Sequence, residues 1–137
     1  METAPSQFML IFRESTPERY EEMSPEQLRQ CLDAWNDWCD SLAGQGRLQH
    51  GNPLEPEGRM VAGARARGAA DGPFAEAKEL IGGYFLLTAA SMDEAVAIAE
   101  QSPNLRYGMT IEVRPVAQRC HLARALGMQT MREPAGA

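Results

Sequence analysis

Three charged side chains crowd together in the middle of the chain. Glu76, Lys78 and Glu79 lie within four positions of one another. A carboxylate paired with a lysine can act as acid and base when burial shifts their pKa values. The same cluster can equally form a surface turn with a salt bridge, or contact a second copy of the chain. The sequence leaves both interpretations open.

A tight turn directly precedes these charges. Asp71 can accept backbone N–H bonds, Gly72 tolerates positive φ, and Pro73 fixes the next φ. Phe74 would then anchor the turn in the core. Asp71 is therefore a further candidate for catalysis and Phe74 for ligand contact, although both can be explained by a structural role.

Four other positions could contribute to a site. Gly82 and Gly83 open an apolar run and would let a neighbouring backbone or a ligand come close. Glu112 and Arg114 share one face of a predicted strand. They could bind a small polar ligand, with Arg114 holding its carboxylate, or form an ion pair between subunits.

The two histidines and three cysteines offer little further chemistry. His50 is a candidate general base that follows a short predicted strand. Cys31, Cys39 and Cys120 match no metal-ligand spacing and are expected to be reduced, buried thiols. We expect no metal site, because no His, Cys and carboxylate set has ligand spacing, and no organic cofactor.

The elements that must hold these residues can be predicted from periodicity and capping signals. Ser24 and Pro25 start a helix that ends near Gly44, and Ser91 starts a second helix. In residue numbers, we expect strands at 7–13, 47–51, 82–88 and 109–114, helices at 24–42 and 92–99, a polar loop at 14–23, a loose hairpin at 59–70 and a helical segment at 116–128.

This order predicts an α+β fold, namely a ferredoxin-like antiparallel sheet with two helices on one face. The other face would be bare within one chain. Strand 7–13 is apolar on both faces, so the bare face should be partly apolar as well. Exposed patches of this kind mark interfaces, so we expect a symmetric homodimer with two sheets packed face to face.

Composition narrows the function classes. The 137 residues fit one domain, and the net charge of −6 disfavours nucleic-acid binding, because it repels the phosphate backbone. The stretch 114–132 is an exception to this acidity, because it contains arginines and no acidic residue. These arginines suit a solvated helix face or an interface better than a nucleic-acid site. No apolar run approaches the roughly 18 residues that cross a bilayer, so we expect no membrane association and a cytoplasmic location.

The run 71–79 followed by Gly82-Gly83-Tyr84 resembles the signature of the YCII-related family, in its branch with the DGPF motif. Supporting matches are the opening run 8–11, the helix start 24–26, and the runs 93–95 and 112–115. The resemblance covers residues 7–116, taken here as the domain, with 117–137 as a C-terminal helical tail.

The resemblance implies a dimeric α+β barrel, a fold whose relatives include small-molecule isomerases, dehalogenating enzymes and monooxygenases. The wider YCII group often has a His/Asp pair in a cleft at the sheet face, and neither His50 nor His121 can be matched to it. The resulting hypothesis is a domain that binds or transforms a small polar molecule in a cleft near the turn at Asp71. The alternative is a non-catalytic dimeric module in which the motif only holds fold and dimer.

Overall fold

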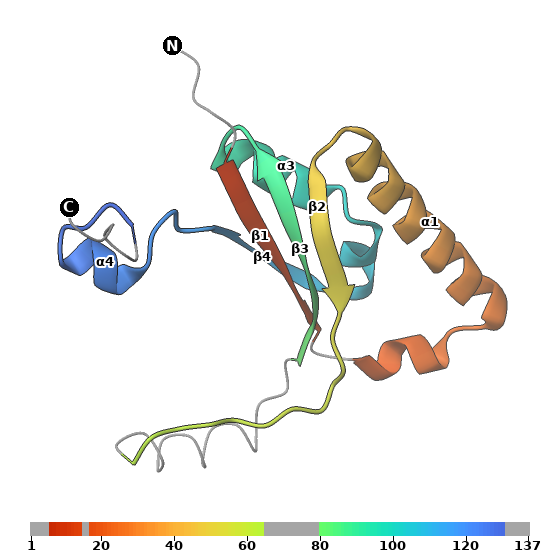
Figure 1. Ribbon diagram of the computed structural model, residues 1–137. Coiled ribbons are helices and arrows are strands. Elements are labelled where there is room, and N and C mark those ends of the chain that lie inside the picture. Colours follow the sequence, from red (N-terminus) through yellow and green to blue (C-terminus); the bar gives the residue numbers. More distant parts are fainter. Residues whose placement is uncertain (1–5, 15–16, 65–79, 131–137) are drawn as a thin grey trace.

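A computed structural model describes residues 6–14, 17–64 and 80–130. Its strands form one antiparallel sheet in the order β2-β3-β1-β4 (Figure 1). In chain order the elements are β1 (Ser6–Glu14), the 3-10 helix η1 (Pro17–Glu22), α1 (Pro25–Gly44), β2 (Leu48–Pro53), β3 (Leu80–Ala89), α3 (Met92–Glu100), the 3-10 helix η3 (Pro103–Tyr107), β4 (Thr110–Pro115) and α4 (His121–Ala125).

Both main helices begin where their capping residues predict. The Ser24 hydroxyl accepts the backbone N–H of Gln27 at 3.1 Å, and the Gln27 side chain accepts the Ser24 N–H at 2.9 Å. This reciprocal pair satisfies two donors that the first turn of α1 would otherwise leave unpaired. The Ser91 hydroxyl accepts the N–H of Glu94 in the same way at the start of α3.

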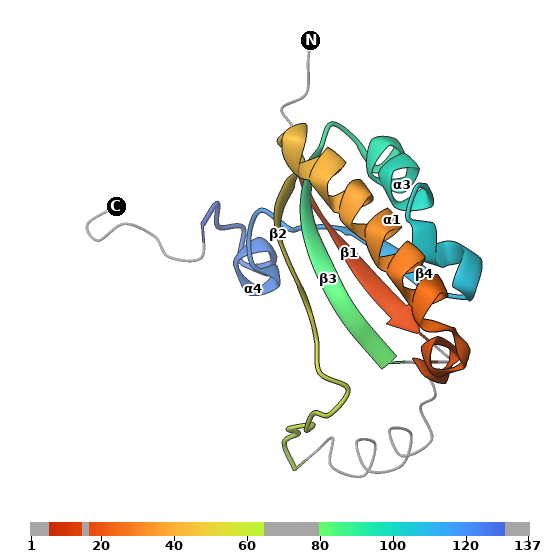
Figure 2. The same cartoon turned by 90° about the vertical axis from the view of Figure 1, so that its right-hand side faces the viewer.

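Helices α1 and α3 cover one face of the sheet, as Figure 2 shows edge-on. The predicted ferredoxin-like α+β fold is therefore confirmed. Alternate residues of the two central strands fill the core between the layers, since successive strand side chains point to opposite faces. Its largest fully buried side chains are those of Leu10 and Leu87.

The opposite face carries no helix in the described part of the chain (Figure 1). Its centre is an apolar stripe of half-buried side chains from the two central strands, which we call the open-face stripe: Met9, Ile11, Tyr84 and Leu86. The register pairs Met9 with Leu86 and Ile11 with Tyr84. The expectation of a partly apolar bare face is thus met within the monomer.

Several local predictions were wrong. The expected loop at 14–23 holds the last residue of β1 and the 3-10 helix η1, and the helical part of 116–128 is only His121–Ala125. Residues 59–64 form no strand, and the rest of the expected hairpin lies outside the described residues. In the described ranges, no helix is both long and apolar enough to span a bilayer.

Candidate functional site

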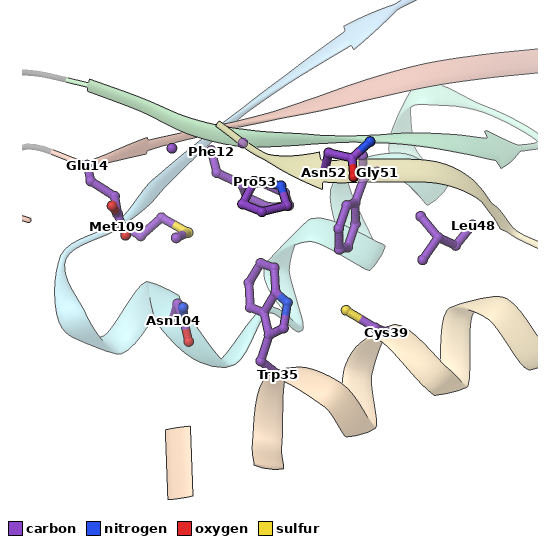
Figure 3. A pocket seen from close by; sticks show the side chains of 13 residues that line it. Phe12, Glu14, Trp35, Cys39, Leu48, Gly51, Asn52, Pro53, Asn104 and Met109 are labelled. Atoms are coloured by element: carbon purple, nitrogen blue, oxygen red, sulfur yellow. The ribbon is translucent and has the colours of Figure 1, made fainter. Parts of the chain in front are cut away.

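A pocket of about 390 Å³ lies between the sheet and the layer formed by α1 and η3 (Figure 3). Its lining includes the last residues of β2 and part of the first half of β3. The residues that line it come from six segments of the chain: Phe12, Glu14, Trp35, Cys39, Leu48, Gly51, Asn52, Pro53, Gly82, Gly83, Phe85, Asn104 and Met109.

Aromatic rings form the inner wall of the pocket. The Phe12 ring lies 5.2 Å from that of Trp35 and 4.9 Å from that of Phe85, both edge-on, and Trp35 lies 5.6 Å from Phe85. Trp38 stacks on Phe85 from behind at 5.3 Å. Because these rings pack against one another, they form a rigid, apolar surface that need not rearrange when a ligand binds. Trp35 thus serves both the core and the pocket.

The other end of the pocket is polar. Tyr20 donates its hydroxyl hydrogen to Oε1 of Glu14 at 3.0 Å and accepts the side-chain amide N–H of Asn104 at 3.3 Å. A carboxylate can only accept, so the phenol must donate to Glu14 and receive from Asn104. Figure 3 shows Glu14 and Asn104 at one end beside Met109, and Leu48 and Cys39 toward the other.

This arrangement fixes the Tyr20 phenol in its neutral form. Its pKa is raised far above the usual value of 10.0, first by burial and then by the neighbouring Glu14 charge. In this neutral form the phenol donates its hydrogen to Oε1. Among the described residues, Oε2 of Glu14 has no hydrogen-bond or ion-pair partner.

Gly82 and Gly83 line the pocket, and other atoms of the protein lie close to both of them. A Cβ on Gly83 would lie 2.8 Å from the carbonyl oxygen of Asn52 and 3.2 Å from Cα of Pro53. A Cβ on Gly82 would lie 3.2 Å from Oε2 of Glu14. The close neighbours are therefore the backbone of β2 and a pocket carboxylate. Ligand contact by these glycines stays a prediction.

His50 lies apart from the pocket, on the open face of the sheet. Its Nδ1 is 2.9 Å from the hydroxyl of Tyr84, and its Nε2 is 3.4 Å from the amide nitrogen of Asn52. Because the amide nitrogen is a donor, the two contacts fit a neutral ring with its proton on Nδ1. The side chain is exposed, and its role as a general base stays a prediction.

Glu112 and Arg114 lie on the same open face, at the β4 side. Arg13 donates to Oε1 of Glu112 from both Nε (3.0 Å) and Nη2 (2.7 Å), while Nε of Arg114 lies 3.4 Å from Oε2. The ion pairs described here are within one chain. Arg114 is the more exposed partner, at 68%, so it retains capacity for another contact.

The remaining predicted site residues lie outside the described residues: Asp71, Phe74, Glu76, Lys78 and Glu79. Within the described ranges, no group of three or more His, Cys, Asp or Glu side chains is placed to hold a metal ion. The cysteines described are free and half-buried rather than fully buried. Burial, and then the charge of Asp40, raise the pKa of the Cys39 thiol in the pocket wall.

Sequence reasoning did not find the polar end of the pocket. A usable signal existed for Glu14, because it continues the alternation of Phe8, Leu10 and Phe12 that marks the core face of β1. An acid in register with core side chains is unusual enough to indicate a cavity. Asn104 carried no comparable signal, since only the three-dimensional fold brings η3 against α1.

Comparison with known proteins assigns the family. A family model described as the YCII-related domain matches residues 8–118, well over half of the chain. The uncharacterized protein R00369 of Rhizobium meliloti (strain 1021) is 38% identical over 88 residues, covering 57% of this chain and 71% of that protein. The chain therefore belongs to the YCII-related domain family.

Proposed function

We propose that this protein binds a small molecule with a largely apolar body and one polar end in the pocket between its sheet and α1. The pocket itself carries the proposal. Its volume of about 390 Å³ falls within the roughly 300–1,000 Å³ common for small-molecule sites. It also has their usual make-up, which is an apolar lining with a few fixed polar groups.

The predicted turn at Asp71 is close in sequence to this pocket. The run 71–79 leads directly into β3, and two of the first residues of β3 line the pocket. We therefore propose that the cleft lies near this motif. Catalysis by Asp71 or by the charged cluster that follows it stays a prediction, as does the structural alternative.

Two cysteines on α1 provide a matched test of the pocket. Cys39 lines it, whereas Cys31 lies eight residues earlier, is also half-buried, and contacts Met23 instead. Cys39→Leu should fill part of the cavity, and Cys31→Leu should leave it open. We expect ring-containing fragments to shift the NMR signals of the pocket residues in the wild type and in C31L, and to bind C39L at least tenfold more weakly.

Circular dichroism checks that both variants remain folded. Equal fragment binding by C39L and the wild type, or fragment shifts confined to other surfaces, would contradict the pocket as the binding site. A complete absence of fragment binding would favour the alternative, in which the domain is a structural module.

We further propose that the protein is a homodimer joined through the open-face stripe. The stripe supplies apolar area, and charges of both signs lie beside it at Arg13 and Glu112. A two-fold axis places each such patch against its own copy, so a patch with both signs can complement itself. A second copy is thus a chemically suitable partner.

Ile11→Lys tests the dimer, because it places a charge in the centre of the stripe. We expect light scattering after size-exclusion chromatography to give a dimer mass for the wild type and a monomer mass for I11K. Leu54→Lys, at a residue already 48% exposed, is the control and should stay dimeric. A wild-type monomer at micromolar concentration would refute the proposal.

A further inference from the structure

The pocket combines aromatic walls with one carboxylate. Among the described residues that line it, Glu14 is the charged one. We propose that the ligand is a small aromatic amine in its protonated form, with its ring against Trp35 and its ammonium group at Glu14. This inference rests on the binding function proposed above and adds the chemical class of the ligand.

Oε2 of Glu14 has no hydrogen-bond or ion-pair partner among the described residues, which is the first argument. Tyr20 donates to Oε1 at 3.0 Å, while Oε2 lies 3.2 Å from the position that a Cβ on Gly82 would take. A carboxylate at neutral pH only accepts hydrogen bonds, so its natural ligand is a donor. An ammonium group supplies both the donor and the opposite charge, which makes the hydrogen bond stronger than a neutral one.

The electrostatics of the walls are the second argument. The faces of Phe12, Trp35 and Phe85 carry the negative side of the ring quadrupole and attract cations. A ligand carboxylate would instead meet the half-buried side chain of Glu14 and be repelled by its like charge. Arg13, the neighbouring residue, points to the open face and donates to Glu112 there.

The shape of the site is the third argument. Glu14 and Asn104 lie at one end, while Trp35 rises from α1 toward the middle of the pocket (Figure 3). A ring with a short side chain fits this arrangement, because its apolar and charged parts are separated in the same way. A pocket of about 390 Å³ is near the lower end of small-molecule sites and suits one or two rings.

A matched ligand series tests the inference. 2-Phenylethylamine, 2-phenylethanol, 3-phenylpropionate and ethylbenzene share a phenyl ring and differ in the polar end. They are titrated by NMR into the wild type, Glu14→Gln and the control Glu100→Gln, which makes the same change at an exposed residue at the end of α3. Thermal unfolding checks that each variant is folded.

We expect the amine to bind the wild type about tenfold or more tightly than the carboxylate, because a charge-assisted hydrogen bond replaces a repulsion. E14Q should lose about tenfold in amine affinity while its affinity for the alcohol stays unchanged, and E100Q should behave as the wild type. Added salt should weaken amine binding to the wild type only modestly, since the charge pair is partly shielded from solvent.

Two kinds of failure are distinguishable. If the carboxylate or the alcohol binds as tightly as the amine, or if E14Q retains full amine affinity, the ligand class is wrong while pocket binding stands. If no member of the series binds the wild type, and ring-containing fragments have equal affinity for C31L and C39L, the pocket proposal is wrong and this inference is wrong with it.

Discussion

Gly83→Ala should destabilise the protein by opening the seam between β2 and β3. The added methyl group would lie 2.8 Å from the carbonyl oxygen of Asn52 and 3.2 Å from Cα of Pro53, where most real Cβ contacts exceed 3.4 Å. Both neighbours are backbone atoms and cannot rotate away, so β2 must move outward. We expect a loss of about 1–3 kcal/mol, the usual cost of overpacking.

Thermal and urea unfolding measure this loss, which corresponds to a fall in Tm of roughly 4–12 °C for a domain of this size. Gly44→Ala is the matched control, since nothing lies within 4 Å of its added methyl group at the end of α1. Helix propensity predicts that G44A is neutral or stabilised by up to about 1 kcal/mol. A G83A variant as stable as the wild type would refute the close-approach argument.

Three further predictions concern single side chains. The pKa of Tyr20 is raised above its unfolded value of 10.0. Its contribution to stability is therefore complete below pH 10 and is lost as the pH rises further. Urea unfolding should show that the free energy of unfolding falls more steeply at alkaline pH for the wild type than for Tyr20→Phe. Burial, and then Asp40, raise the pKa of Cys39 above 9.0; its alkylation by iodoacetamide, followed by mass spectrometry, should therefore rise at higher pH than that of a cysteine peptide. Leu10→Ala, at a residue with no exposure, should cost about 2–5 kcal/mol, whereas Leu54→Ala on the surface should change the unfolding free energy little.

The sheet and both main helices could be predicted because their signals are local. The capping box at Ser24 and the alternation along β1 each depend on a few neighbouring residues, and both appear as expected. The apolar side chains of α1 are buried unevenly. Trp38 and Leu42 are buried, but Leu28 and Leu32 are 39% and 53% exposed, because the first turns of the helix extend beyond the core.

The pocket could not be predicted because it depends on contacts between distant segments. Glu14, Tyr20 and Asn104 form one hydrogen-bonded chain although 84 residues separate Tyr20 from Asn104. The site residues predicted from the sequence are mostly charged, whereas the pocket is mainly aromatic. Arg114, which was predicted to hold a ligand carboxylate, lies on the other face of the sheet.

The alternation of β1 separates the two proposed surfaces and makes them independently testable. Phe12 and Glu14 point into the pocket, while Ile11 and Arg13 point to the open face. The acidic binding end and the proposed dimer surface therefore share a strand without sharing a side chain. If this separation holds, Ile11→Lys should change the mass of the particle but leave amine affinity unchanged. A loss of amine affinity in folded, monomeric I11K would instead mean that the second copy helps to complete the pocket.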